Sequence, residues 1–138
     1  MASYTKFDSF VEAVCEKVHN LGSDTLKVAL CAAANAPVAA NSVLADLTEI
    51  DYTNLSARAL TTSSSGQTSG TYKLVLADLT LEASGGAVAA FQYIVIYNDT
   101  ASNKELIGFY DYGSAVTLND ADQFVLDFNA STGVIQLA

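Results

Sequence analysis

The first part of the chain carries the apolar pattern of a helix. Its apolar side chains are separated by one or three positions, which places them on one face of an α-helix. They are Phe7, Phe10, Val11, Val14, Cys15, Val18 and Leu21. Thr5, with Asp8 three positions later, suits the start of such a helix, and Gly22 suits its end. The pattern predicts a helical N-terminal arm over residues 1–22.

After Gly22 apolar and polar side chains alternate, which is typical of half-buried β-strands. The runs cover residues 26–31, 58–62, 71–77, 79–81, 91–97, 106–112, 116–118, 124–128 and 134–137. Residues 43–50 fit either a strand or a single helical turn. About eight strands with frequent turns predict an all-β fold, an antiparallel β-sandwich of the jelly-roll kind, over residues 23–138.

Three stretches refine this interpretation. Residues 91–97 are apolar on both faces, which predicts a central strand. Residues 32–41 are mostly small and contain the only proline, and they predict a loop. Residues 63–70 are a polar run of low complexity, which predicts a flexible loop at the surface.

Composition and charge exclude several classes of protein. Hydrophobic residues make up 51% of the 138 positions and charged residues 15%, which excludes a disordered chain. No apolar run approaches the roughly 20 residues of a membrane span, and residues 1–10 lack the apolar centre of a secretion signal. The net charge is −9. We therefore expect no binding to nucleic acid and no membrane binding through the overall field.

The sulfur and imidazole groups are few. Cys15 falls on the predicted helix stripe and Cys31 at the end of a predicted strand, so we expect both to be buried free thiols. His19 is the single histidine and is expected to face solvent. These three side chains are too few for a closed zinc site.

The acidic residues offer weak candidates for chemistry. Asp120 and Asp122, beside Asn119, fit a turn that caps its own backbone, with a calcium-like oxygen cluster as the less favoured alternative. Asp99, Asp111 and Asp127 could supply a glycosidase pair, an interpretation that we favour least. No nucleophile elbow or phosphate-binding glycine loop is present. We expect no enzyme activity and no cofactor.

Aromatic side chains concentrate in one predicted hairpin. They are Tyr93, Tyr97, Phe109, Tyr110 and Tyr112. The favoured interpretation is a core with tyrosines at its rim, because the phenol hydroxyl can reach water there. Exposed rings of this kind would also suit a carbohydrate-binding face.

Several segments resemble a family of small tailed-bacteriophage virion proteins that are similar to head decoration, or cement, proteins. The segments are 6–19, 26–30, 69–74, 91–100, 106–113 and 124–128. The resemblance implies binding to the outer surface of an assembled capsid, with the major capsid protein as partner and the virion as location. It also implies assembly in the host cytoplasm, whose reducing conditions agree with free thiols. A homo-oligomer that matches shell symmetry is expected, with a trimer ahead of a dimer.

Candidate contacts for the oligomer or the capsid come from the helix stripe and the two predicted loops. They are Phe7, Phe10, Val14, Pro37, Val38, Ser64 and Gln67. The competing hypothesis is a carbohydrate- or receptor-binding β-sandwich module on a virion tail or fibre, because sandwiches of this kind support both functions.

Overall fold

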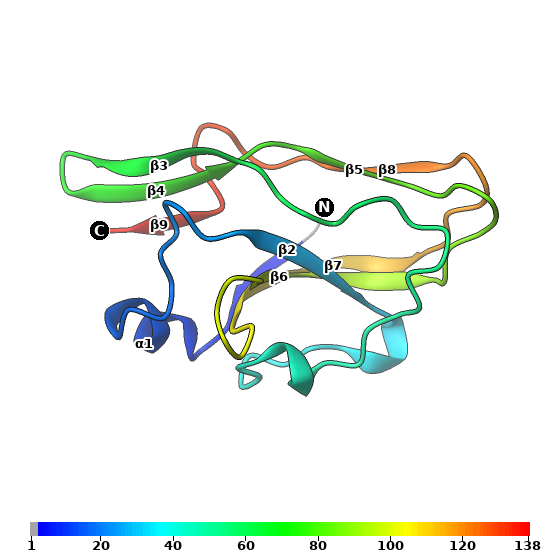
Figure 1. Ribbon diagram of the computed structural model, residues 1–138, viewed down its shortest axis with the longest axis horizontal. Helices are drawn as coiled ribbons and strands as arrows, with labels where there is room; N and C mark the ends of the chain where they lie inside the picture. Colours follow the sequence, from blue (N-terminus) through cyan, green and yellow to red (C-terminus); the bar gives the residue numbers. More distant parts are fainter. Residues whose placement is uncertain (1–2) are drawn as a thin grey trace.

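The computed structural model describes residues 3–138, which form two antiparallel layers (Figure 1). The lower layer is a four-stranded sheet in the order β1-β7-β6-β2. Its strands are β1 (Ser3–Lys6), β2 (Leu26–Cys31), β6 (Phe91–Asn98) and β7 (Leu106–Val116). Its central pair, β6 and β7, is a hairpin closed by the turn after Asn98, as the sequence predicts.

The upper layer consists of two short sheets placed end to end (Figure 1). One has the order β3-β4-β9 and the other pairs β5 with β8. Their strands are β3 (Thr62–Thr68), β4 (Thr71–Leu76), β5 (Leu79–Glu82), β8 (Gln123–Leu126) and β9 (Ile135–Leu137). The chain breaks between β4 and β5, and the Asp78 carboxylate accepts a hydrogen bond of 2.9 Å from the Phe128 amide across the break. The all-β antiparallel sandwich is therefore confirmed.

The main core lies between the two layers. The inward side chains of β2, β4, β6 and β7 meet there in one cluster that contains Leu30, Leu74, Phe91 and Ile107. A second cluster, on the outer face of the lower sheet, contains Phe7, Cys31, Val95 and Phe109. Leu30 and Cys31 are neighbours on β2 and belong to different clusters, because successive side chains of a strand point to opposite faces of its sheet.

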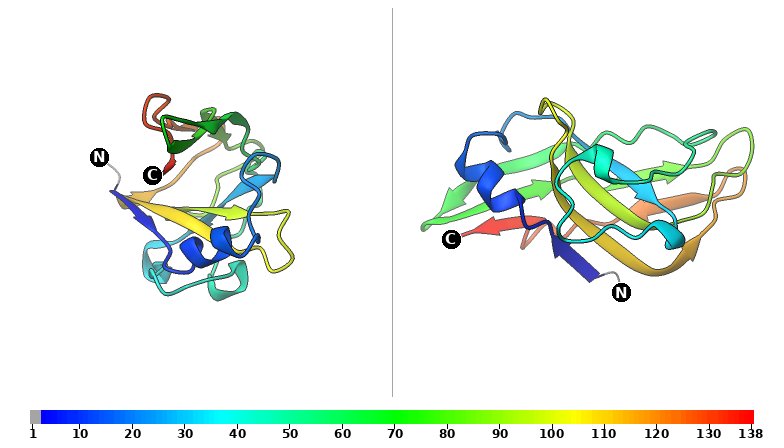
Figure 2. Two further views of the ribbon diagram at one scale, coloured as in Figure 1. Left: turned by 90° about the vertical axis from the view of Figure 1, so that its left-hand side faces the viewer. Right: turned by 90° about the horizontal axis from the view of Figure 1, so that it is seen from below.

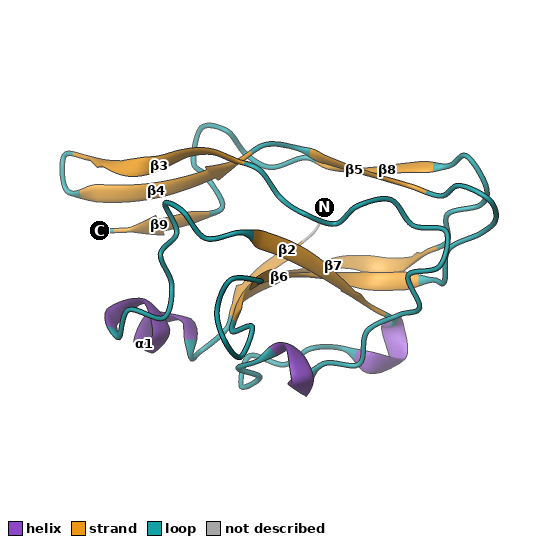
Figure 3. Ribbon diagram, viewed as in Figure 1, coloured by secondary structure: helices purple, strands orange, loops and turns teal. Residues whose placement is uncertain are grey.

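A layer of loops covers this outer face (Figure 3). It contains two single-turn 3-10 helices, η1 (Ala33–Asn35) and η2 (Leu44–Asp46), so residues 43–50 adopt the helical-turn alternative. Leu44 and Leu47 pack against the outer cluster. The central strand β6 is thus buried on both faces, which explains its continuous apolar run.

The predicted helix is much shorter than its pattern. Within residues 3–138, α1 (Phe10–Cys15) is the only α-helix, and residues 3–6 form β1 instead. Thr5 therefore lies in a strand and caps nothing. Lys17, at φ 67°, ends the helix in the left-handed conformation, and Val18 N–H bonds to Ala13 C=O as in a Schellman motif. Gly22, the predicted end, lies beyond it.

The apolar stripe predicted too long a helix because its side chains do not all pack in one place. They belong to different clusters. Phe7 enters the outer cluster and Phe10 the main core, on opposite faces of the lower sheet. Val11 is 44% exposed and Cys15 is also exposed. The spacing therefore reflects a chain that crosses the edge of the sheet, and not one helix face.

The N-terminal strand is held at the border of the lower sheet (Figure 2). The Tyr4 ring lies 4.9 Å from the Tyr110 ring, measured between centroids. It also occupies the space above Gly108, where a β-carbon would stand 2.2 Å from the Tyr4 hydroxyl. Glycine at position 108 is required for this close approach.

Candidate functional site

The predicted contact residues are divided between the core and the surface. Phe7 and Phe10 are 0% and 1% exposed, and Pro37, within the loop layer, is buried. Val14 is half-buried against the main core. These four side chains stabilise the fold, and they offer a partner little or no surface.

The other three predicted contacts are exposed but lie in different layers. Val38, 56% exposed, belongs to the loop layer below the lower sheet. Ser64 and Gln67 are exposed on β3 in the upper layer (Figure 1). The structure therefore does not bring the predicted contacts together into one surface.

Residues 63–70, predicted as a flexible loop, form the strand β3 and its turn. β3 pairs with β4, and the pair Thr68–Thr71 closes the hairpin. Ser69 and Gly70 have φ values of 51° and 84°, the left-handed pair typical of a two-residue type I′ turn. The strand is exposed on both faces, so it needs no apolar alternation, and its polar sequence was mistaken for a loop.

The hairpin geometry fixes which backbone groups of β3 are free. The closing pair of a two-residue turn exchanges both hydrogen bonds, and bonded pairs then alternate with non-bonded ones. Gly66 is therefore bonded to β4, whereas the backbone groups of Ser65 and Gln67 point to the outer edge. Since β3 is the border strand of its sheet, this edge has no partner strand among residues 3–138.

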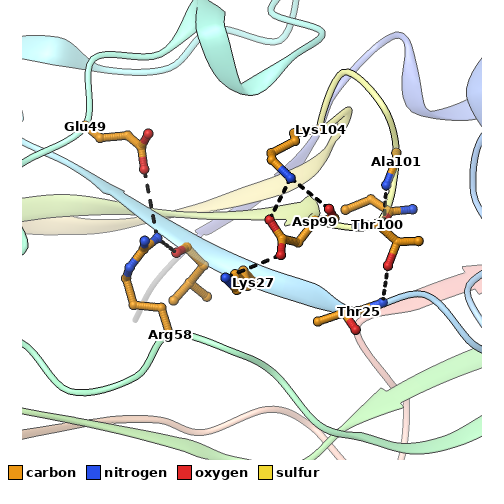
Figure 4. Close-up of polar contacts among 10 residues, drawn as sticks. Thr25, Lys27, Glu49, Arg58, Asp99, Thr100, Ala101 and Lys104 are labelled. Carbon is orange, nitrogen blue, oxygen red and sulfur yellow. Dashed lines mark hydrogen bonds and ion pairs between the residues drawn. The ribbon is translucent and has the colours of Figure 1, made fainter.

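The neighbouring edge of the lower sheet is closed. Residues 58–60 run along β2, where Leu60 N–H donates to Leu26 C=O at 2.9 Å. Arg58 Nη1 donates to Val28 C=O at 2.7 Å and lies 3.9 Å from a Glu49 oxygen (Figure 4). The Arg58 guanidinium also stacks 3.7 Å above the Tyr52 ring.

An apolar groove of about 290 Å³ lies between β7 and β8. Its walls include Tyr110 and Tyr112 from β7 and Phe124 and Val125 from β8. Tyr112 is 44% exposed and Val125 53% exposed, which makes them two of the five exposed large apolar side chains among residues 3–138. Asp127 is the one charged side chain of its lining.

Aromatic rings connect this groove to the core. Phe91, fully buried, meets Phe124 edge-on at 5.5 Å, and Phe124 meets Tyr112 at 5.2 Å. Burial raises the pKa of the Tyr110 hydroxyl above its usual range. Tyr97 and Phe109 are buried, while Tyr112 stands at the surface, which agrees with a core that has tyrosines at its rim.

A buried polar cluster fastens the segment after α1 to the sandwich. Asn98 Oδ1 accepts from the amides of Thr100 and Ala101 at 3.0 and 3.2 Å, which directs its NH2 group to His19 Nδ1 at 2.9 Å. The same NH2 group donates to Asp24 at 2.6 Å. His19 Nδ1 is therefore the acceptor, and the ring is neutral with its proton on Nε2.

His19 was predicted to face solvent and is 7% exposed instead. It is drawn inward because its ring packs 5.4 Å from Phe10 and Asn98 supplies a buried donor. Burial lowers the pKa of His19, and the carboxylates of Glu105 and Asp24 oppose that shift in part. His19 Nε2 and Glu105 Oε2 are buried with no hydrogen-bond partner in the described part of the chain.

This cluster predicts a dependence of stability on pH. The folded pKa of His19 lies below its unfolded value of about 6.5, so the unfolded chain protonates first. The free energy of unfolding should therefore be highest above pH 6.5 and fall as the pH drops from there through the folded pKa. Urea unfolding of the wild type and His19→Gln at a series of pH values measures this, and equal slopes for both proteins would contradict it.

The two cysteine thiols differ in their exposure to solvent. Cys31 is buried as predicted, and burial, with Glu49 nearby, raises its pKa to about 11. Cys15, predicted to be buried, is exposed because α1 turns only Phe10 and Val14 toward the core.

The acidic candidates accept hydrogen bonds. Asp122 accepts from the Asn119 amide at 3.0 Å, as expected of a turn that caps its own backbone. Asp120 instead accepts from the amide of Gly85, in a distant turn, also at 3.0 Å. Asp99 binds Lys104 and Lys27 at 2.9 and 3.3 Å (Figure 4), and the bond from Lys104 keeps its pKa below the usual range.

Two features escaped the sequence interpretation. The free edge of β3 was hidden by its polar composition, although the Ser69–Gly70 pair is a turn signal. The groove combines β7 with β8, and nothing in the sequence pairs Tyr112 with Val125.

No protein-family model matches this chain at a significant level, and neither a curated protein nor a solved structure does. Within residues 3–138, no helix is long and apolar enough to cross a membrane.

Proposed function

We propose that this protein is a bacteriophage virion component that binds the outside of the capsid and stabilises the shell. The observation that carries the proposal is the groove between β7 and β8, where Tyr112 and Val125 remain exposed beside buried rings. Tyrosine and apolar side chains in such a setting are typical of surfaces that dock proteins. The partner would be the major capsid protein.

The rigid sandwich and its charge support this role. Phe124 is anchored on Phe91, so the groove is preformed and little ordering is needed on binding. The net charge of −9 disfavours contact with packaged DNA and suits the capsid exterior. The resemblance of the strand segments to virion proteins points in the same direction.

Stabilisation would follow from mass action. A protein that binds only the closed shell stabilises it by RT ln(1 + [L]/Kd), about 2.7 kcal/mol per site at a hundredfold excess over Kd. Many sites act on one particle, so modest affinity at each site is sufficient.

The test compares Val125→Ser with Val38→Ser. The two valines are 53% and 56% exposed, so both substitutions should leave stability almost unchanged. We expect Val125→Ser to weaken binding to capsids of the encoding phage by about tenfold, the loss of roughly 1.4 kcal/mol at an interface. Co-sedimentation with capsids measures binding, and the temperature of DNA release measures stabilisation.

Three outcomes would contradict this proposal in different ways. If Val38→Ser weakens binding and Val125→Ser does not, the contact lies in the loop layer. If the wild type binds but DNA escapes at an unchanged temperature, the protein does not stabilise the shell. If the wild type does not bind capsids, the decoration role is wrong.

The groove also supports a second candidate, a carbohydrate-binding module on a virion tail or fibre. An exposed tyrosine ring such as Tyr112 can stack on a sugar, and the Asp127 carboxylate in the same lining can accept hydrogen bonds from hydroxyl groups. Glycan binding that Tyr112→Ala abolishes, without capsid binding, would favour this candidate.

A further inference from the structure

We propose that two copies of this chain pair through their β3 strands, in an antiparallel arrangement with two-fold symmetry. The inference concerns a surface separate from the groove between β7 and β8 and does not depend on the capsid role. It starts from the outer edge of β3, where the backbone groups of Ser65 and Gln67 have no partner strand.

From Ser64 to Thr68 the edge of β3 lacks the features that protect exposed strands. Natural edges are short, charged, interrupted by proline or covered. β3 is seven residues long, and residues 63–70 contain no charged side chain and no proline. An irregularity interrupts its pairing only near its start, between Thr62 and Ser64.

The other sheet borders in residues 3–138 are short, covered or irregular. β7 extends past β1 after Asp111, and there its pairing with β6 is irregular and Gly113 has a φ of 89°. β2 is covered by residues 58–60, and β1 is four residues long and ends in Lys6. Beside β5, Ser56 N–H donates to Glu82 C=O at 3.0 Å. β8 and β9, on the opposite border of the upper layer, are only four and three residues long and a loop separates them.

Charge favours a second copy as the occupant. Two chains of net charge −9 repel each other, and they can approach best where no carboxylate faces another. The hairpin of β3 and β4 meets this condition, because residues 62–76 contain no acid and one base, Lys73. In Figure 1 the hairpin extends beyond the end of β2, so the remaining surfaces of two paired copies can stay apart.

The register follows from the free backbone groups. If Gly66 faces Gly66 of the second copy, Ser65 faces Gln67 of the second copy, and each such pair exchanges both of its backbone hydrogen bonds. Like Ser65, Gln67 is exposed and uncharged, so no charge is buried. A β-carbon added at Gly66 meets no atom within 4 Å, so this position on the two-fold axis tolerates a side chain in the single chain.

The experiment introduces charged side chains at Gly66, next to the proposed two-fold axis. The wild type should be a dimer in sedimentation and light scattering, whereas Gly66→Lys and Gly66→Glu should each self-associate at least tenfold more weakly, because like charges then face each other. Ser102→Lys, in the exposed turn after β6, is the control with the same change of charge as Gly66→Lys. An equimolar mixture of Gly66→Lys and Gly66→Glu should restore the dimer.

Amide exchange provides a second readout. The amides of Ser65 and Gln67 should be protected only at concentrations where the dimer forms, whereas Gly66, bonded within the hairpin, should be protected at all concentrations. A wild type that remains a monomer at about 1 mM, a trimer, or a dimer that survives in Gly66→Lys would overturn the proposal. These measurements use the protein without capsids, so failure of shell binding leaves their result unaffected.

Discussion

Replacing Phe10 with alanine is expected to lower the free energy of unfolding by about 3–5 kcal/mol. Phe10 is 1% exposed and is the side chain that joins α1 to the main core. Its truncation removes contacts with the core and leaves a cavity beside the His19 ring, 5.4 Å away. Because small domains have about 5–15 kcal/mol in total, the variant should be marginally folded.

Val11→Ala is the matched control for this prediction. Val11 follows Phe10 in the same helix and is 44% exposed, so its truncation should cost at most about 1 kcal/mol. Urea unfolding of the two variants measures the difference. Equal losses would mean that α1 is not docked on the core as the structure describes.

Phe10 also illustrates where the sequence interpretation was sound and where it failed. Its burial was predicted correctly, because an apolar side chain in a periodic segment belongs to a core. Its role as an interface residue is not supported by its position, since it is enclosed within its own chain. Periodicity shows that a face is buried, but it does not show whether the covering surface belongs to the same chain.

The strands were predictable to the extent that they alternate. β2 and β6 coincide closely with the expected runs. Their side chains point alternately into the main core and into the outer cluster, on opposite faces of the sheet. β3 did not alternate, because neither of its faces is buried, and its pairing with β4 supplies the stabilisation. β1 was missed because its residues directly precede the apolar stripe and were included in the predicted helical arm.

The candidate surfaces depend on contacts between distant segments. Tyr112 and Phe124 meet at 5.2 Å only because β7 and β8 belong to different layers that converge there. Asn98 and His19 are 79 positions apart in the chain, and their hydrogen bond reversed the expected exposure of the histidine. Local spacing contains no information on such pairs.

The second large effect is expected at Gly133, which precedes the last strand. Its φ of 75° lies in the left-handed region, and an added β-carbon would stand 2.6 Å from the Leu74 carbonyl oxygen. The same oxygen accepts a hydrogen bond of 2.8 Å from the Val134 amide, at the start of the pairing between β4 and β9. A side chain at position 133 must therefore displace the backbone that holds β9.

Gly133→Ala is expected to lower the free energy of unfolding by roughly 2–4 kcal/mol, as the sum of the left-handed conformation and the clash with the backbone. Gly70→Ala isolates the first contribution, because Gly70 has a φ of 84° and its added β-carbon would meet no atom within 4 Å. We expect that control to lose only about 1–2 kcal/mol. Urea unfolding measures both losses, and faster amide exchange at Val134 in Gly133→Ala alone would locate the damage at β9. Equal losses in the two variants would show that Leu74 can move aside, so that the contact between β4 and the segment before β9 is softer than its geometry indicates.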